Sequence, residues 1–525
     1  MLERIRRALS SVTPQEALLT ALLLFMVWHY RWIMDDAFIY FRYADNALFL
    51  GRGLVYNPNE YVEGYSSPAW MLIVLGLRAL RLDYFTITLL LGFACASAYA
   101  ALMIAANRKL TPAGIPTLCF PLAISAAHYG ITTHFTGGLE TPLVQVFAAL
   151  YALALVQPSS RALQIAIAFS PLVRPELGAP AVLFAAWNAV DTKRMPWAFA
   201  ITFVTVNAAW VAFRIWYYAD VLPNTFYLKD GSHVNQGLWY LADVVYAHHW
   251  IPIGLALIAL AYVAREHVTT PSRGARFAML GIAAVYAAYV VRIGGDMLYH
   301  RYASFPVCLG ACAGAGVCEA GLLRFAPEPR RKLAALGGCG AIVLLFALSY
   351  PPQYQANPFF FDSKSGHWHG IADAVWHRTK PDLRYSDARG AEDRALLADY
   401  AKLKPNVAPR LSLVTGWCRR AYNAYDQHVV HAYGLTDAVL SRVPGVFGRP
   451  GHKLVEDKAY DLARWRRADR FRHDAASTTR WLKQKRVPRW VKKNADSMKL
   501  IDRKIYNRHR FGENLRLALT HITFR

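Results

Sequence analysis

Recurrent apolar runs constrain the fold of this chain more than any other feature. Twelve such runs follow one another through roughly the first two thirds of the 525 residues. They cover approximately residues 17–31, 68–80, 85–106, 115–127, 139–156, 163–173, 177–190, 197–213, 241–263, 277–291, 305–323 and 333–348. A spanning helix needs about 20 predominantly apolar residues, so the pattern is typical of a polytopic α-helical membrane protein. Only Arg174-Pro175-Glu176 separates two of the runs, and merging them into one proline-broken span gives about 11 spans.

The character of the sequence changes after Tyr350, where Pro351-Pro352 opens a stretch of mixed charges and aromatics. We predict a transmembrane domain over residues 1–350 and a soluble α/β or α+β domain over residues 351–525. The basic N-terminus favours the cytoplasm, and Thr13-Pro14-Gln15-Glu16 predicts a capped start for an uncleaved first helix. An odd number of spans then places the C-terminal domain outside the cytoplasm.

The net charge of +24 is concentrated near the C-terminus, where residues 449–525 carry 22 Lys and Arg against 8 Asp and Glu. In a soluble protein such a tail would suggest nucleic acid. After a membrane domain we expect anionic phospholipid or an anionic glycan instead, and no nucleic acid. A solvated basic surface is the simpler alternative. Of the seven cysteines only Cys418 lies in this soluble part, which excludes a disulfide within it, and no zinc-binding pattern is present.

Two adjacent carboxylates, Asp35 and Asp36, stand where the first apolar run ends. If residues 35–49 form a helix, Asp35, Arg42 and Asn46 share one face, since their separations are close to two and three turns. Ionisable groups at membrane depth are costly and usually functional. One interpretation is therefore a catalytic base at a membrane surface. The other is an ordinary acidic pair that marks the end of a helix.

Each of the other ionisable residues in the apolar part has both a functional and a structural explanation. Glu140 follows two glycines and would either line a cavity or stabilise the N-terminus of a helix as an ordinary acidic residue. Arg174 and Glu176 would bind a ligand or neutralise each other. Glu63 would line a cavity or cap the second apolar run.

The loop that contains Asp296, His300 and Arg301 combines an acid, an imidazole and a guanidinium between two apolar runs. Such a loop suits phosphate, because guanidinium matches its oxygens in a bidentate way. The alternative is a connecting loop with basic residues at the lipid headgroups. Lys229 is a further phosphate candidate, although for Lys229 by itself a snorkelling interfacial lysine is the favoured explanation. The P-loop, the GxSxG elbow, HExxH and the Rossmann glycines are all missing, so soluble-nucleotide chemistry has no support.

Several stretches, taken together, resemble bacterial polytopic glycosyltransferases of the GT-C class. The group most similar in these motifs is the terminal arabinofuranosyltransferase-like one, which uses decaprenyl-phosphate arabinofuranose. The stretches are Asp35-Asp36-Ala37-Phe38-Ile39, Phe41-Arg42-Tyr43, Gly53-Leu54-Val55-Tyr56-Asn57-Pro58, Val62-Glu63-Gly64-Tyr65-Ser66-Ser67-Pro68, Gly138-Leu139-Glu140-Thr141, Arg174-Pro175-Glu176, Pro223-Asn224-Thr225-Phe226-Tyr227 with Lys229, Gly294-Gly295-Asp296 with Arg301, Gly434-Leu435-Thr436-Asp437 and Gly448-Arg449-Pro450-Gly451-His452-Lys453.

The resemblance implies transfer of a pentose from a polyprenyl-phosphate donor on the outer face of the bacterial inner membrane. The acceptor would be an envelope glycan or a surface protein, and the surroundings would be membrane lipids. No cofactor is expected, no residue is identified as a metal ligand, and a requirement for a divalent metal stays open from the sequence. The first-loop aspartates, Asp35 or Asp36, would act as the catalytic base. Candidates for the donor phosphate are Arg42, Lys229, His300 and Arg301. Candidates for sugar or acceptor binding are Glu63, Glu140, Arg174, Glu176 and Asp296.

Two other functions remain open from the sequence. One is a GT-C transferase that uses a different polyprenyl sugar, such as a mannose or an aminoarabinose. The other is a flippase or transporter of lipid-linked sugars, with the charged residues along its path. A transporter is expected to show two related halves, and none is visible in the sequence.

Overall fold

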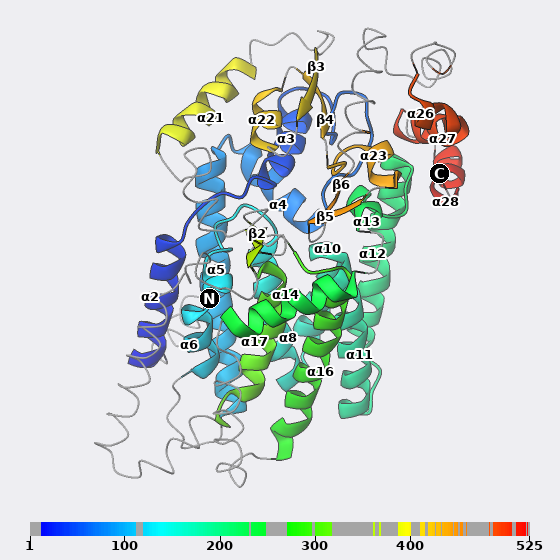
Figure 1. Ribbon diagram of the computed structural model, residues 1–525. Helices are drawn as coiled ribbons and strands as arrows, with labels where there is room; N and C mark the ends of the chain where they lie inside the picture. The colour runs from blue at the N-terminus through cyan, green and yellow to red at the C-terminus, as the bar shows by residue number, and fades with distance from the viewer. Residues whose placement is uncertain are drawn as a thin grey trace. The chain divides into compact units, whose positions relative to one another are not determined.

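A computed structural model describes most of the chain up to residue 317 and shorter pieces after it (Figure 1). The described residues are 12–111, 119–229, 233–247, 270–296, 300–317, 361–362, 367–368, 387–400, 410–414, 418–425, 427–431, 433–444, 446–449, 452–454, 458, 482, 487–506, 511–520 and 522. They are mostly helical. The chain divides into two compact units, each assembled from separate segments of the sequence.

The first unit comprises residues 1–32, 88–203 and 233–381. Its elements are α2 (Pro14–His29), most of α5 (Tyr84–Leu110), α6 (Phe120–Ala127), α7 (Tyr129–Thr132), α8 (Thr141–Val156), α9 (Arg161–Ala168), α10 (Ser170–Val173), η1 (Pro175–Leu177), α11 (Gly178–Thr192), the start of α12 (Trp197–Tyr218), α14 (Val234–Ala247), α16 (Thr270–Arg292), η2 (Arg301–Ala303), α17 (Ser304–Gly314) and the antiparallel pair β1 (Phe361–Asp362) and β2 (His367–Trp368).

Local sequence signals explain several of these helix boundaries. The side chain of Thr13 accepts a hydrogen bond from the backbone N–H of Glu16, and the carboxylate of Glu16 accepts one from the backbone N–H of Thr13, so the predicted capping box is confirmed. The predicted proline-broken segment is confirmed too. There α9 to α11 are interrupted at Arg174, because the residue before a proline avoids the helical conformation.

Three of the described helices are long and apolar enough to cross a membrane. They are Tyr84–Leu110 with 27 residues, Trp197–Tyr218 with 22 residues, and Arg273–Arg292 with 20 residues. Exposed apolar side chains lie along α12, among them Trp197, Ile201 and Val204, as expected for a helix that faces lipid. The prediction of about 11 spans is not decided, because run 333–348 and parts of three others lie outside the described residues.

The second unit comprises residues 33–87, 204–232 and 382–525. Its elements are α3 (Ala37–Leu48), α4 (Pro68–Ala79), the end of α12, α13 (Asn224–Leu228), α21 (Asp387–Tyr400), β3 (Arg410–Val414), α22 (Cys418–Asn423), β4 (Gln427–His431), α23 (Ala438–Arg442), β5 (Val446–Arg449), β6 (His452–Leu454), α26 (Arg489–Lys493), α27 (Ala495–Ile505) and α28 (Phe511–Leu519). The predicted domain boundary at 350/351 lies outside the described residues and stays a prediction.

The second unit contains both helix–strand and hairpin elements. Strands β3 and β4 are parallel, with Arg410 opposite Gln427, and α22 lies between them in the sequence. Strands β5 and β6 form an antiparallel pair. An apolar core joins the first loop to the C-terminal helices, because Val62 packs with Val430, Leu440, Ile501 and Ile505. Residues after 382 therefore fold together with the first loop.

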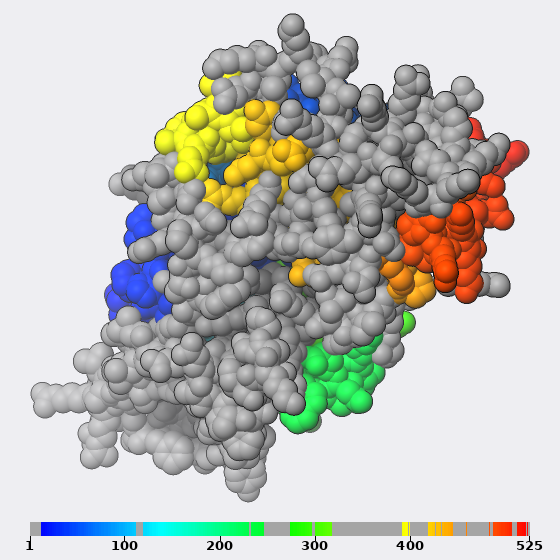
Figure 2. All heavy atoms as spheres, turned by 45° about the horizontal axis from the view of Figure 1, so that its top comes forward, coloured from blue at the N-terminus to red at the C-terminus, as the bar shows by residue number. Residues whose placement is uncertain are grey.

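The C-terminal helices form part of the surface in Figure 2. Helix α27 buries Met498, Ile501 and Ile505 on one side, while Lys499 and Arg503 are exposed. This arrangement is typical of an amphipathic helix that packs on a protein core. The predicted contact of the basic tail with anionic lipid or glycan stays a prediction.

Candidate active site

The acidic pair lies directly before α3, in the second unit. We predicted a helix over residues 35–49, but α3 begins at Ala37 and Asp36 occupies its N-cap position. Asp35 therefore precedes the helix and does not share its face with Arg42. Arg42 and Asn46 do share a face, since both donate hydrogen bonds to the carbonyl of Tyr56, at 2.8 and 2.9 Å.

The N-terminus of α22 holds the carboxylate of Asp35. The backbone N–H of Cys418 donates to Oδ2 at 2.7 Å, and that of Arg419 donates to Oδ1 at 3.1 Å. The first N–H groups of a helix have no partner within the helix and favour negative charge, so this contact fixes both oxygens. Cys418 lies 383 residues further along the chain than Asp35, which is why the sequence gives no hint of the contact.

The surroundings of Asp35 favour proton exchange near neutral pH. Burial and the neighbouring Asp36 carboxylate raise the pKa of Asp35 to about 6, while the N–H groups of Cys418 and Arg419 act in the opposite direction. Both side chains are half-buried. Among the described residues, no cationic side chain forms an ion pair with either carboxylate. Asp35 is therefore mostly ionised at pH 7 and has the basicity expected of a general base.

Cys418 completes this group, and no signal in the sequence singled it out. Its Sγ lies 3.7 Å from Oδ1 of Asp36 and 3.2 Å from Nε2 of His431. Burial and the two carboxylates raise the pKa of the thiol well above its usual range. The side chain is therefore a protonated thiol and not a thiolate nucleophile. It serves as a buried partner of the acidic pair.

Asp35, Asp36 and Cys418 are also the one set of potential metal ligands in the described part of the chain, with ligand atoms within 4.8 Å of one another. This closeness alone does not make them a metal site, since both oxygens of Asp35 already accept backbone hydrogen bonds. The expectation that no cofactor is needed stays a prediction, and the question of a divalent metal stays open.

Arg42 is buried, and its guanidinium contacts backbone. Its Nε donates to Tyr56, one terminal nitrogen donates to Ala421 and Ala424, and the other donates to Gln427. Arg42 thus ties the first loop to the segment that carries Cys418. Its predicted contact with donor phosphate stays a prediction, and these bonds leave few of its five N–H donors for a ligand.

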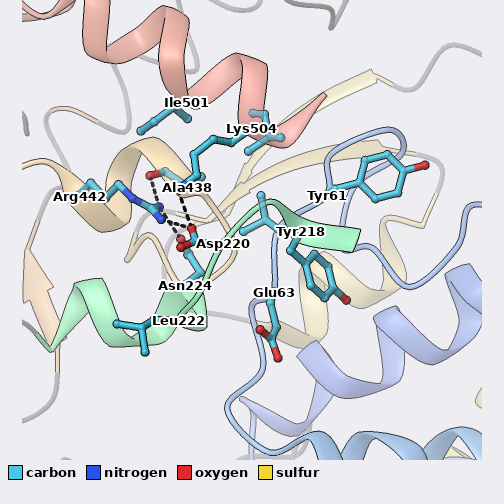
Figure 3. Close-up of a pocket in the computed structure, with 12 residues that line it drawn as sticks. Tyr61, Glu63, Tyr218, Asp220, Leu222, Asn224, Ala438, Arg442, Ile501 and Lys504 are labelled. Atoms are coloured by element: carbon cyan, nitrogen blue, oxygen red, sulfur yellow. Dashed lines mark hydrogen bonds and ion pairs between the residues drawn. The ribbon is translucent and has the colours of Figure 1, made fainter. Parts of the chain in front are cut away.

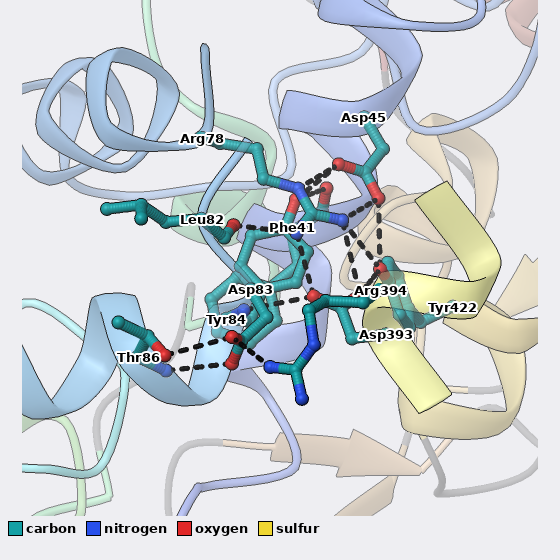
Figure 4. A network of polar contacts seen from close by, with 10 residues as sticks. All are labelled: Phe41, Asp45, Arg78, Leu82, Asp83, Tyr84, Thr86, Asp393, Arg394 and Tyr422. Atoms are coloured by element: carbon teal, nitrogen blue, oxygen red, sulfur yellow. Dashed lines mark hydrogen bonds and ion pairs between the residues drawn. The ribbon is translucent and has the colours of Figure 1, made fainter. Parts of the chain in front are cut away.

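The second unit contains a saturated charge cluster that we did not predict (Figure 4). Arg78 forms ion pairs with Asp45 at 2.8 Å and Asp393 at 2.7 Å, and all three side chains are at most 5% exposed. Tyr84 and Tyr422 donate further hydrogen bonds to the carboxylates. Arg78 was not among the predicted site residues, although a single arginine in an apolar run is itself a signal.

Two more predicted residues lie in the second unit. Glu63 is buried and forms an ion pair with Arg214 through Nε, with a second contact at 3.3 Å. Lys229 is half-buried and follows the end of α13. Arg214 was not identified as the partner, because it lies 151 residues from Glu63.

The other predicted residues belong to the first unit and form ion pairs there. Arg174 contacts Glu140 at 2.5 Å, pairs with Glu176, and donates to the hydroxyl of Tyr302 at 2.6 Å. The structure thus contains the mutual neutralisation that the sequence left open for Arg174 and Glu176. Burial of such a group is tolerated because every charge has a partner.

The glycine-containing loop forms two separate pairs in the first unit. Arg301 contacts Asp296 at 2.6 Å, and His300 contacts Asp243 at 2.7 Å. His300 adopts a left-handed backbone conformation with φ of 47°, which is uncommon for a residue with a side chain. Asp243 was not among the predicted residues, although an acid inside an apolar run is itself a signal. The phosphate and sugar roles of all six residues of this unit stay predictions.

Comparison with known proteins identifies two relatives. The chain is 29% identical to a terminal β-(1→2)-arabinofuranosyltransferase of Mycobacterium tuberculosis, over 55% of this chain and 53% of the relative. It is 28% identical to a terminal β-(1→2)-arabinofuranosyltransferase of Corynebacterium glutamicum, over 53% of this chain and 47% of the relative. The chain resembles terminal arabinofuranosyltransferases. The resemblance read from the motifs is thereby confirmed.

The chain spans about half the length of the curated relatives that it matches. No family model matches the sequence, and no solved structure matches the fold. The activity of this chain is therefore a matter for proposal, and the roles of individual residues rest on the contacts described above.

Proposed function

We propose that this chain is a membrane glycosyltransferase that moves arabinofuranose from a polyprenyl-phosphate donor to an envelope glycan or a surface protein. The similarity to two arabinofuranosyltransferases supports the class of reaction. The observation that carries the mechanism is the Asp35 carboxylate, which two backbone N–H groups fix in a half-buried position. We place the reaction at the extracytoplasmic face of the bacterial inner membrane, in line with the expected topology.

In the proposed step, Asp35 accepts the proton of an acceptor hydroxyl while that oxygen forms a bond to the anomeric carbon of the donor sugar. The bond between the anomeric carbon and the phosphate oxygen breaks, and the polyprenyl phosphate leaves with the electron pair. A hydroxyl is a poor nucleophile until a positioned base takes its proton. Positive charge near the leaving phosphate lowers the barrier further, and we retain Arg42, Lys229, His300 and Arg301 as candidates.

Asp36 and α22 do not take the proton; Asp36 tunes the pKa of Asp35, and α22 orients its carboxylate. The negative charge of Asp36 keeps the pKa of Asp35 high enough for proton transfer near neutral pH. The N–H groups of Cys418 and Arg419 orient the carboxylate, which leaves its remaining lone pairs for the acceptor hydroxyl. The proposed sugar ligands are Glu63, Glu140, Arg174, Glu176 and Asp296.

The test is a transfer assay with the purified full chain and a panel of polyprenyl-phosphate sugars that includes arabinofuranose, mannose and aminoarabinose. We expect turnover with the arabinofuranose donor and its loss in Asp35→Asn. Asp496→Asn is a matched control, because Asp496 lies on α27 and its side chain is 94% exposed. Turnover with a different sugar would redirect the proposal to another polyprenyl donor. Movement of lipid-linked sugar across vesicles without transfer would replace it with a flippase.

A further inference from the structure

A cavity in the second unit is not assigned to the proposed transfer reaction (Figure 3). It lies among the end of α12, α13, α23 and α27, and it also touches the first loop. Its polar lining comes from Glu63, Asp220, Asn224, Arg442 and Lys504, and the remaining lining is formed by apolar side chains and two tyrosines.

One carboxylate in this cavity is shared by two cations. Oδ2 of Asp220 accepts from Arg442 at 2.5 Å and from Lys504 at 3.2 Å. Oδ1 accepts from the hydroxyl of Tyr227 at 2.6 Å and from the backbone N–H of Val221 at 3.0 Å. The carboxylate is therefore saturated, and the Arg442 guanidinium also lies over the ring of Tyr227, 3.7 Å from its centre.

The charges that line the cavity do not balance. Glu63, the second carboxylate of the lining, is neutralised by Arg214 outside it. Asp220 is then left with both Arg442 and Lys504, whose side chains are 6% and 5% exposed. A buried charge without a counter-charge is costly. The lining therefore has one positive charge more than its carboxylates compensate.

The ammonium of Lys504 is the cation that carries this excess positive charge in the cavity lining. An ammonium has three N–H donors, and Asp220 is the one hydrogen-bond acceptor that contacts Lys504 among the residues that the structure describes. Burial lowers the pKa of Lys504, while Asp220 opposes that shift. An anion in the cavity would hold the ammonium in its charged form and occupy donors that Asp220 leaves over.

We propose that this cavity binds an oxyanion, a phosphate or a carboxylate, between the ammonium of Lys504 and the guanidinium of Arg442. Charge-assisted hydrogen bonds to two cations suit either group. The inference stands apart from the proposed transfer reaction, because Asp220, Arg442 and Lys504 have no role in that reaction. Glu63 is the lining residue that also serves as a proposed sugar ligand.

The experiment is thermal unfolding of the full chain in detergent, with added inorganic phosphate or glucuronate at constant ionic strength set by chloride. A ligand that binds the folded state raises the unfolding temperature in a saturable way. We expect this for at least one of the two probes, and the responding probe identifies phosphate or carboxylate as the ligand group. In Lys504→Gln the affinity for that probe should fall about ten- to hundredfold, the usual effect of losing one hydrogen bond to a charged group.

Two further variants make the result specific. Lys499→Gln removes the same charge from an exposed position on α27 and should bind the probe like the unmodified chain. Asp220→Asn removes the carboxylate that competes with the anion for Lys504 and Arg442. The unfolding temperature of this variant should therefore depend more strongly on the added anion. This variant still tests the proposal if Lys504→Gln fails to fold. The proposal is overturned if neither probe stabilises the chain beyond chloride, or if Lys504→Gln and Asp220→Asn respond like Lys499→Gln.

Discussion

Two acidic clusters in the second unit differ in how completely their charges are satisfied. Around Arg78, the carboxylates of Asp45 and Asp393 are buried, paired with the guanidinium and hydrogen-bonded by tyrosine hydroxyls. Asp35 and Asp36 are half-buried, and the carboxylate of Asp35 is held by two backbone N–H groups without a cation among the described residues. In the first cluster both carboxylates share one guanidinium and accept tyrosine hydroxyls, whereas the second keeps a carboxylate with lone pairs available.

The difference separates a charge cluster that maintains the fold from one that can do chemistry. A saturated, buried cluster strongly resists the loss of one partner. A carboxylate with a raised pKa and a neighbouring acid has the properties of a catalytic base. The same residue type thus has opposite roles, and substitution should affect activity at one cluster and stability at the other.

The largest effect on activity is expected at the acidic pair. Asp35→Asn keeps the size of the side chain but cannot accept a proton, so the transfer rate should fall about 10²- to 10⁴-fold. The measurement is turnover of purified variants, with the unfolding temperature recorded alongside. Normal turnover in both Asp35→Asn and Asp36→Asn would remove the basis for calling this pair catalytic.

The largest effect on stability is expected at Arg78. Arg78→Met leaves Asp45 and Asp393 as buried charges without a cation, which should lower the free energy of unfolding by about 3–5 kcal/mol. Denaturant titration measures this change. The triple variant Arg78→Met, Asp45→Asn, Asp393→Asn should recover part of the loss, because no uncompensated charge remains. A stable Arg78→Met protein would show that the cluster is not structural.

A smaller loss of stability is expected at Arg42. Its guanidinium donates to backbone carbonyls of Tyr56, Ala421, Ala424 and Gln427, and an ammonium cannot reproduce that planar set. Arg42→Lys should cost about 1–3 kcal/mol, in line with the loss of one or two hydrogen bonds to a charged group. If stability is unchanged while the KM for the donor rises, Arg42 binds the donor phosphate instead.

The smallest effect is expected from Asp36→Asn on the pH dependence of transfer. Removing the negative charge beside Asp35 lowers the pKa of that carboxyl. The acid side of the activity profile should therefore move to lower pH. At pH 5 the variant should keep a larger fraction of its own maximal rate than the unmodified chain keeps of its maximal rate. A profile that stays in place would mean that the two carboxylates do not interact.

The sequence located the acidic pair because ionisable residues at the end of an apolar run are conspicuous. It placed Asp35 inside a helix, since a spacing argument cannot show that the helix begins two residues later, at Ala37. Capping and proline signals are local, which is why Thr13, Glu16 and the break at Arg174 were predicted correctly.

Long-range partners could not be predicted in this way. Arg78 and Asp393 are 315 residues apart, and no periodic pattern relates them. The same applies to Cys418 beside Asp35 and to Arg214 beside Glu63. A single sequence reveals which residues are unusual in their local setting, but the partner that decides between a structural and a chemical role comes from the fold.

The most direct test of the central claim is the pH profile of kcat/KM for transfer by the unmodified chain. Asp35 must be ionised to accept a proton, and its pKa is about 6. The account predicts that kcat/KM is constant above about pH 7 and falls tenfold per pH unit well below pH 6. A profile that stays flat from pH 7 down to pH 4.5 would contradict the assignment of Asp35 as the base.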